Sequence, residues 1–227
     1  MFGLDAKIAS CSDGTTLLIV IGVAVLLGLR HASDPDHVAA VTTLVASERE
    51  RASRNAARLG LAWGLGHATT LFVFGLPVVL YSSYLPKRLQ QAAEMSVGIV
   101  IVALALVLLA RWRRGSYSEG AHHTHSRRTG AQAFGVGLVH GMGGTAGVGL
   151  LLLATIRSQT VAVIALALFA FFTAVSMTLL STGWGLALGS APVRRSFHRV
   201  APALGFVSLA FGVWYALGAQ GVVPYVL

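Results

Sequence analysis

Charged residues are scarce in this sequence. Lys, Arg, Asp and Glu make up 11% of the 227 residues, whereas soluble domains contain about 25%. Hydrophobic residues make up 55%, and the mean hydropathy is positive. This composition excludes an ordinary soluble domain and is typical of an integral membrane protein.

Cysteine and the common catalytic motifs are also nearly absent. The single cysteine, Cys11, excludes an internal disulfide and redox chemistry between paired cysteines. There is no Walker-type glycine motif and no His-Glu-x-x-His pattern, which argues against a built-in ATPase and a metalloprotease. Because these motifs are missing, we expect a protein that is not an enzyme. Residues 1–14 lack the basic start of a cleaved signal peptide, so none is expected.

Long apolar runs are what the sequence does contain. Each is long enough to cross a bilayer as a helix, and Arg-rich breaks separate them. We predict an all-α polytopic membrane protein, with residues 1–227 forming one transmembrane domain. The six predicted spans are approximately Thr15 to Ala46, Leu59 to Tyr81, Leu89 to Ala110, Ala131 to Ile156, Thr160 to Leu188 and Val200 to Val223.

The net charge of +9 comes mainly from arginines between the apolar runs. Twelve arginines lie in the connections after the first, third and fifth runs, against four Lys or Arg on the opposite side. They are not interleaved with aromatic residues, so we interpret them as topology determinants and predict no nucleic-acid partner. Because basic loops stay in the cytoplasm, a multi-pass protein of the cytoplasmic (inner) membrane with both termini outside is predicted.

The first run leads directly into the polar segment Arg30-His31-Ala32-Ser33-Asp34-Pro35-Asp36-His37. Ionisable side chains inside a membrane are costly, and they are tolerated mainly where they line a pathway or pair with one another. Pro35 has no amide hydrogen for the carbonyl of His31, so the helix is predicted to open here and to leave that carbonyl free. An unbroken helix would point these side chains apart, whereas an opened one turns them toward one small volume.

Imidazole and carboxylate ligands in this segment favour a late first-row dication such as Ni(II), Co(II), Zn(II) or Cu(II) over Mg(II) and Ca(II). The candidate ligands are His31, Asp34, Asp36 and His37. The alternative is that both histidines are packing residues bonded to carbonyls and that one aspartate pairs with Arg30.

Two further histidines lie inside apolar runs. His67 is the candidate ligand from a second helix, and its alternative role is a hydrogen bond to a neighbouring Ser or Thr. His140 precedes Met142 in a run of glycines that disfavours a regular helix. His140 is predicted either to bind the cation, together with Met142, or to orient a carboxylate. Glu94, near one end of the third span, is expected to be a solvated interfacial acid.

An internal duplication is indicated by a shift of 109 residues. It sets Gly28-Leu29-Arg30-His31 on Gly137-Leu138-Val139-His140, so that His140 corresponds to His31. Three spans in each half make an inverted 3+3 repeat, the arrangement in which substrate sites lie between the halves. The halves are about 15–111 and 131–223. The loop 112–130 that joins them contains His122, His123 and His125, which form either a metal-catching tract or a solvated linker.

The motifs resemble those of a known family. His31, followed after four residues by Asp36-His37, resembles the signature of the nickel/cobalt transporter family, and Leu65-Gly66-His67-Ala68-Thr69 resembles its second motif. The chain lacks the first span of longer members, and His140-Gly141-Met142-Gly143-Gly144 stands where they have an acidic motif. It is therefore similar to the short, six-span, urease-accessory type of member.

The resemblance implies a secondary transporter of Ni(II), and also of Co(II), working by uptake across the cytoplasmic membrane. It implies functional roles for His31, Asp36, His37 and His67, with the metal as transported substrate, the bilayer as surroundings and no cofactor. The alternative is an exporter of divalent metals or small solutes from the same wider superfamily, which the histidine-containing loop suits equally well.

Overall fold

The computed structural model describes residues 14–46, 52–81, 86–115, 129–141, 143 and 146–224. Every regular element within these ranges is a helix, as predicted from the composition. In chain order the helices are α2 (Gly14–His31), α3 (Pro35–Ala46), α4 (Ala52–Tyr81), α5 (Lys87–Arg113), α6 (Gly130–His140), α7 (Ala146–Ala154), α8 (Gln159–Gly189), α9 (Ala191–Arg195) and α10 (Phe197–Ala219).

The helix lengths fit a multi-pass membrane protein. Helices α4, α5, α8 and α10 are each long and apolar enough to cross a membrane. Helices α2 and α3 pass the same test together, with a bend of 48° between them. The fourth predicted span is divided into α6 and α7, of 11 and 9 residues, and neither can cross a hydrocarbon core of about 30 Å alone. The described residues therefore contain up to five spans, and the sixth stays a prediction.

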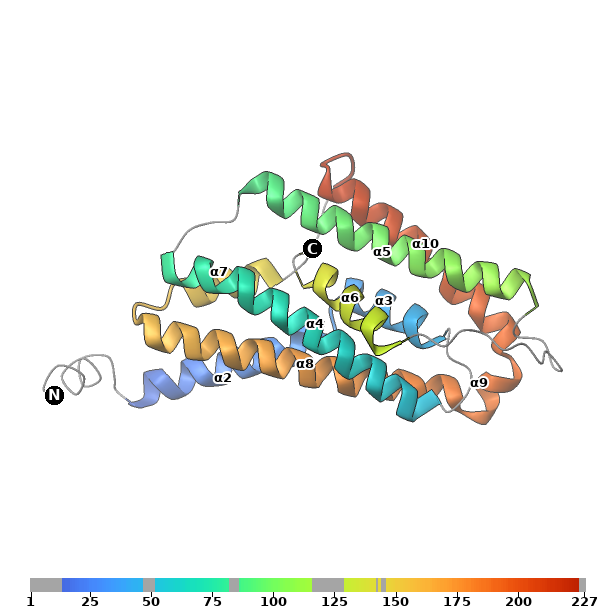
Figure 1. Ribbon diagram of the computed structural model, residues 1–227, viewed down its shortest axis with the longest axis horizontal. Helices are drawn as coiled ribbons and strands as arrows, with labels where there is room; N and C mark the ends of the chain where they lie inside the picture. The colour runs from blue at the N-terminus through green and yellow to red at the C-terminus, as the bar shows by residue number, and fades with distance from the viewer. Residues whose placement is uncertain are drawn as a thin grey trace, which may run out of the picture.

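The long helices form two packed pairs, α4 with α8 and α5 with α10. Figure 1 shows α5 and α10 along one edge of the molecule, α2, α4 and α8 along the other, and the short α3 and α6 between them. Glycine allows the close approach within each pair. A Cβ atom on Gly64 would lie 2.9 Å from the Ala174 carbonyl oxygen, and one on Gly98 would lie 2.8 Å from Ala216 Cβ. Small residues at helix contacts are typical of membrane proteins.

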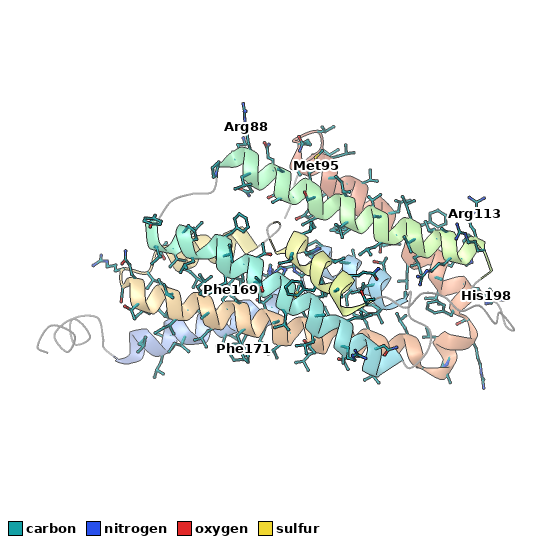
Figure 2. The ribbon with its side chains drawn as sticks, viewed as in Figure 1. Arg88, Met95, Arg113, Phe169, Phe171 and His198 are labelled. Atoms are coloured by element: carbon teal, nitrogen blue, oxygen red, sulfur yellow. The ribbon has the colours of Figure 1, made fainter. Side chains whose placement is uncertain are left out.

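Helix α3 lies at the centre of the largest buried cluster. Its residues Val41 and Leu44 pack in one cluster with Trp63 of α4, Ile101 of α5 and Met177 of α8. The outward faces of the surrounding helices instead carry exposed large apolar side chains, as expected of surfaces that meet lipid. Phe171, on the outer side of α8 in Figure 2, is one of them. Because α3 is enclosed by other helices, the residues at its first turn are held in the interior.

Basic residues gather at one end of the bundle. The end of α5, all of α9 and the start of α10 lie together there, whereas the start of α5 and the end of α4 lie at the opposite end (Figure 1). Arg113 and Arg88 mark the two ends in Figure 2. At the basic end the indole Nε1–H of Trp112 donates to the His198 carbonyl at 2.9 Å, which ties α5 to α10. This arrangement agrees with the predicted grouping of the Arg-rich connections, and the orientation across the membrane stays a prediction.

Candidate metal centre

The first helix break lies where the sequence predicts it. Helix α2 ends at His31 and α3 begins at Pro35. The turn between them is closed by backbone bonds, with the Ser33 N–H donating to the Arg30 carbonyl at 2.8 Å and the Asp34 N–H donating to the His31 carbonyl at 3.1 Å. The prediction of a free His31 carbonyl is therefore wrong, because a buried carbonyl needs a donor and the tight turn supplies one.

The second break follows His140, the last residue of α6. The start of α6 is fixed by a capping box, in which Thr129 and Gln132 exchange side-chain and backbone hydrogen bonds. Its other end is pressed against α4, because a Cβ on Gly137 would collide with the Trp63 carbonyl and one on Gly141 would lie 2.5 Å from the His67 carbonyl oxygen. This close packing brings His140 to the part of α4 that carries His67.

Five side chains from these elements form two groups of three that share His37. The first triad is His31, His37 and His67, and the second is Asp36, His37 and His140. Within each triad the candidate ligand atoms lie within 4.8 Å of one another. The ring centroid of His37 is 4.6 Å from that of His31, 5.0 Å from that of His67 and 4.5 Å from that of His140. The structure thus brings together His31, Asp36, His37, His67 and His140, all predicted from the sequence.

The two aspartates stand in different relations to the imidazoles. Oδ1 of Asp36 lies 3.0 Å from His37 Nδ1, and its Oδ2 lies 3.4 Å from His140 Nε2. Asp34 is hydrogen-bonded to the other side of His31, with Oδ2 3.0 Å from Nδ1, and its Oδ1 lies 3.8 Å from Arg30. Asp34 is in neither triad of the described residues. A carboxylate on Nδ1 orients the ring, so that His31 Nε2 faces His67.

The separation of the Nε2 atoms of His31 and His67 fits a shared metal ion. These two nitrogens are 3.1 Å apart. With metal–imidazole bonds of about 2.0 Å, neighbouring nitrogens are about 3.3 Å apart on a tetrahedral ion and about 2.8 Å apart on a square-planar one. Two rings at the observed distance can therefore bind one ion without backbone movement.

The cluster is buried and rich in polar atoms without hydrogen bonds. His37, His67 and His140 are each 0% exposed, and Asp36 is 1% exposed. Within the described part of the chain, His37 Nε2, His67 Nδ1 and His140 Nδ1 have no hydrogen-bond partner, and Asp36 Oδ2 and His140 Nε2 have no partner besides their mutual 3.4 Å contact. Leaving a buried polar group unsatisfied costs about 1–3 kcal/mol. So many unsatisfied atoms at one point are expected where side chains serve a ligand.

Two aromatic rings pack against the cluster, from positions that the histidine motifs do not indicate. The Trp63 ring centroid lies 5.8 Å from that of His37 and 5.7 Å from that of His140, and the Phe169 ring lies 5.7 Å from that of His31. Trp63 is four residues before His67 and so lies on the same face of α4. The four-residue spacing between Trp63 and His67 is the sequence signal that could have placed Trp63 beside the cluster. The rings form part of the apolar surroundings of the buried polar groups.

Glu94 differs from its predicted environment. Its side chain was expected to be solvated, but it is only 7% exposed, and it accepts a hydrogen bond from Gln90 Nε2 at 3.0 Å. The prediction is wrong because the neighbouring turn of α5 is covered by α10, where a Cβ atom on Gly98 would lie 2.8 Å from Ala216 Cβ. Met142, His122, His123 and His125 lie outside the described residues.

Comparison with known proteins gives two relatives. The chain is 26% identical over 216 residues to the urease accessory protein UreH of Bacillus sp., a match that covers 89% of this chain and 92% of that protein. It is 33% identical over 95 residues to the high-affinity nickel transport protein of Cupriavidus necator, covering 40% of this chain and 27% of that protein. No family model matches the chain, and no solved structure matches it.

Both relatives are named as transport or accessory proteins, in agreement with the prediction that the chain is not an enzyme. The match to UreH extends over nearly the whole chain and therefore includes both helix breaks. The resemblance predicted from the two histidine motifs, to the nickel/cobalt transporter family in its short urease-accessory form, is thereby confirmed.

Proposed function

We propose that this protein is a secondary transporter that takes up Ni(II), and also Co(II), across the cytoplasmic membrane. The observation that carries the proposal is the buried cluster of four imidazoles and one carboxylate inside a bundle of membrane-length helices. Ionisable groups at that depth mark ion pathways, and this donor set suits a late first-row dication. The name of the nickel transport relative supports the same substrate.

In this proposal the ligands of the transported ion come from His31, Asp36, His37, His67 and His140, and Asp34 orients His31. Imidazole nitrogens and a carboxylate oxygen replace the water that the ion sheds as it leaves solution. A dication that moves inward gains about 4.6 kcal/mol per 100 mV, twice the figure for a single charge. The membrane potential alone therefore suffices to concentrate the metal, which agrees with the lack of a nucleotide-binding motif in the sequence.

We also propose that the domain is an inverted 3+3 repeat. The shift of 109 residues moves the end of α2 onto the end of α6, moves α4 onto residues 161–190, where α8 lies, and moves α5 onto residues 196–222, where α10 lies. The helix packing supports this relation, because α2 packs against α8 and α6 packs against α4. Each broken helix thus rests on the long helix of the other half. The pair α6 and α7 then counts as the sixth span, with both termini outside the cytoplasm.

Matching hydrogen bonds at the two breaks support the same proposal. The carbonyl of Leu29, near the end of α2, accepts from Ser176 Oγ of α8 at 2.6 Å. The carbonyl of Leu138, near the end of α6, accepts from Thr70 Oγ1 of α4 at 2.9 Å. Leu29 and Leu138 correspond under the shift of 109 residues. In both halves a hydroxyl from the opposite half satisfies a carbonyl that the helix end leaves without an intrahelical donor.

Whole-cell accumulation of radioactive nickel tests the function. Cells that express the protein should accumulate more nickel than cells with an empty vector, and unlabelled cobalt should compete. His37→Ala should reduce accumulation to the vector level, because His37 is in both triads. His198→Ala, at an exposed histidine on the basic end, is the matched control and should leave accumulation unchanged. Accumulation below the vector level would instead indicate export, and equal accumulation with and without the protein would refute transport of nickel.

A further inference from the structure

The two triads of the cluster share one residue, and this overlap suggests how an ion moves within it. Two ligand atoms on opposite sides of one ion are at most about 4 Å apart when the bonds are about 2.0 Å long. Each triad, with its atoms within 4.8 Å, is close to that limit. The described residues provide two such groups of three and no group of five. The rings of His67 and His140, which belong to different triads, have centroids 6.3 Å apart.

We propose that the cluster offers the transported dication two overlapping positions that share His37. The ion steps from one to the other by exchanging His31 and His67 for Asp36 and His140. The inference rests on the proposed function and adds to it a second ion position and an order of ligand exchange.

The environment of His37 explains why only one position is filled at a time. Its Nδ1 lies 3.0 Å from Asp36 Oδ1, whereas its Nε2 has no hydrogen-bond partner among the described residues. A ring whose Nδ1 is bonded to a carboxylate presents Nε2 to a metal, and one nitrogen has one lone pair for that purpose. The ion therefore keeps its bond to His37 while the other ligands change, which avoids complete loss of coordination in a dry environment.

The positions differ in charge and in the helices that form them. The first consists of three imidazoles, which are neutral when they bind metal, and the second contains the Asp36 carboxylate, which offsets part of the ion's charge. His31 is the last residue of α2 and His140 is the last residue of α6. Each position thus includes the end of a different broken helix. Displacement of the end of α2 moves His31 and alters the first position, and displacement of the end of α6 moves His140 and alters the second. Neither of these two displacements moves a ligand of the other set, as long as α3 stays in place.

Nickel binding to the purified full-length protein in detergent, combined with cell uptake, tests the two positions. The variants are His67→Ala, which removes a ligand from the first triad only, and His140→Ala, which does so for the second only, with His198→Ala as control. Wild type and both variants should each bind one Ni(II) per chain, measured by equilibrium dialysis. X-ray absorption should count three imidazoles on the ion in His140→Ala and two in His67→Ala. Both variants should lose uptake.

Three results would overturn the proposal. Loss of all binding in either variant would mean that the five side chains form one composite position. Uptake at the wild-type rate in either variant would mean that transport does not need the triad from which the ligand was removed. Two Ni(II) ions bound at once to the wild-type chain would contradict a ligand shared between the positions. His67→Gln and His140→Gln, which keep a polar side chain of similar volume, give the same readouts if an alanine variant does not reach the membrane. Wild-type protein that shows this binding pattern but no uptake would refute the proposed function alone.

Discussion

Substitution of Gly141 by alanine should disable the metal centre through a backbone displacement. A Cβ atom at this position would lie 2.5 Å from the His67 carbonyl oxygen, and ordinary contact begins at 3.4 Å. The end of α6 and the middle of α4 must therefore separate by about 0.9 Å to reach ordinary contact. Gly141 has φ −71° and ψ −8°, which alanine adopts without strain, so the effect is steric.

That displacement is large on the scale of metal coordination. Ligand distances in a metal site hold to within about 0.2 Å of their ideal values, and His140, next to Gly141, already lies 3.4 Å from the Asp36 oxygen. Shifting α6 away from α4 displaces the His140 ring relative to Asp36 and His37. We expect Gly141→Ala to reduce nickel uptake by at least tenfold while the protein remains in the membrane. Changes to groups that position metal ligands typically reduce metal affinity or activity about 10–100-fold.

A matched control is available on the same helix. A Cβ atom on Gly135 of α6 would meet nothing among the described residues within 4 Å, and Gly→Ala inside a helix is stabilising by about 0.5–1 kcal/mol. Gly135→Ala should therefore leave uptake unchanged. Uptake is measured with radioactive nickel and normalised to the amount of protein in the membrane. Wild-type uptake by Gly141→Ala would refute the reasoning that the contact between α4 and α6 positions His140.

Three further predictions concern other parts of the centre. Asp34→Asn keeps the shape of the side chain but removes the charge that orients His31 through the 3.0 Å hydrogen bond. The nickel affinity of the purified protein should therefore fall about 10–100-fold, and an unchanged affinity would contradict an orienting role. Trp63→Ala removes a fully buried indole from the largest core cluster and should lower the free energy of unfolding by about 3–5 kcal/mol, whereas Trp63→Phe should lower it less. Thermal unfolding in detergent measures the difference, and equal unfolding midpoints for the two variants would contradict it. Acidification should weaken nickel binding and release bound nickel, because imidazole binds metal only in its neutral form. Equilibrium dialysis at a series of decreasing pH values measures the effect, and nickel binding that strengthens with acid would exclude imidazole ligands.

The sequence by itself determined the helical class and the places where helices break. Apolar runs of span length between Arg-rich connections identify membrane helices, because the bilayer leaves few other conformations available. Pro35 and the glycines after His140 act on the backbone within a few residues, so their effects are local and predictable. The sequence indicates four candidate ligands in the two motifs by residue type and by position within apolar runs, because such side chains are rare there. They are His31, Asp36, His37 and His67.

Only the tertiary structure decided how these side chains divide into two triads. His37 and His140 are far apart in the chain, and their 4.5 Å ring separation depends on the packing of α6 against α4. The same packing makes His140 a member of the second triad, whereas the turn between α2 and α3 places Asp34 behind His31, and contacts of α5 bury Glu94. Sequence spacing determines which residues are neighbours along one helix, whereas contacts between helices depend on which helix faces meet. Close helix contacts at residues such as Gly137 and Gly141 determine which faces of α4 and α6 meet.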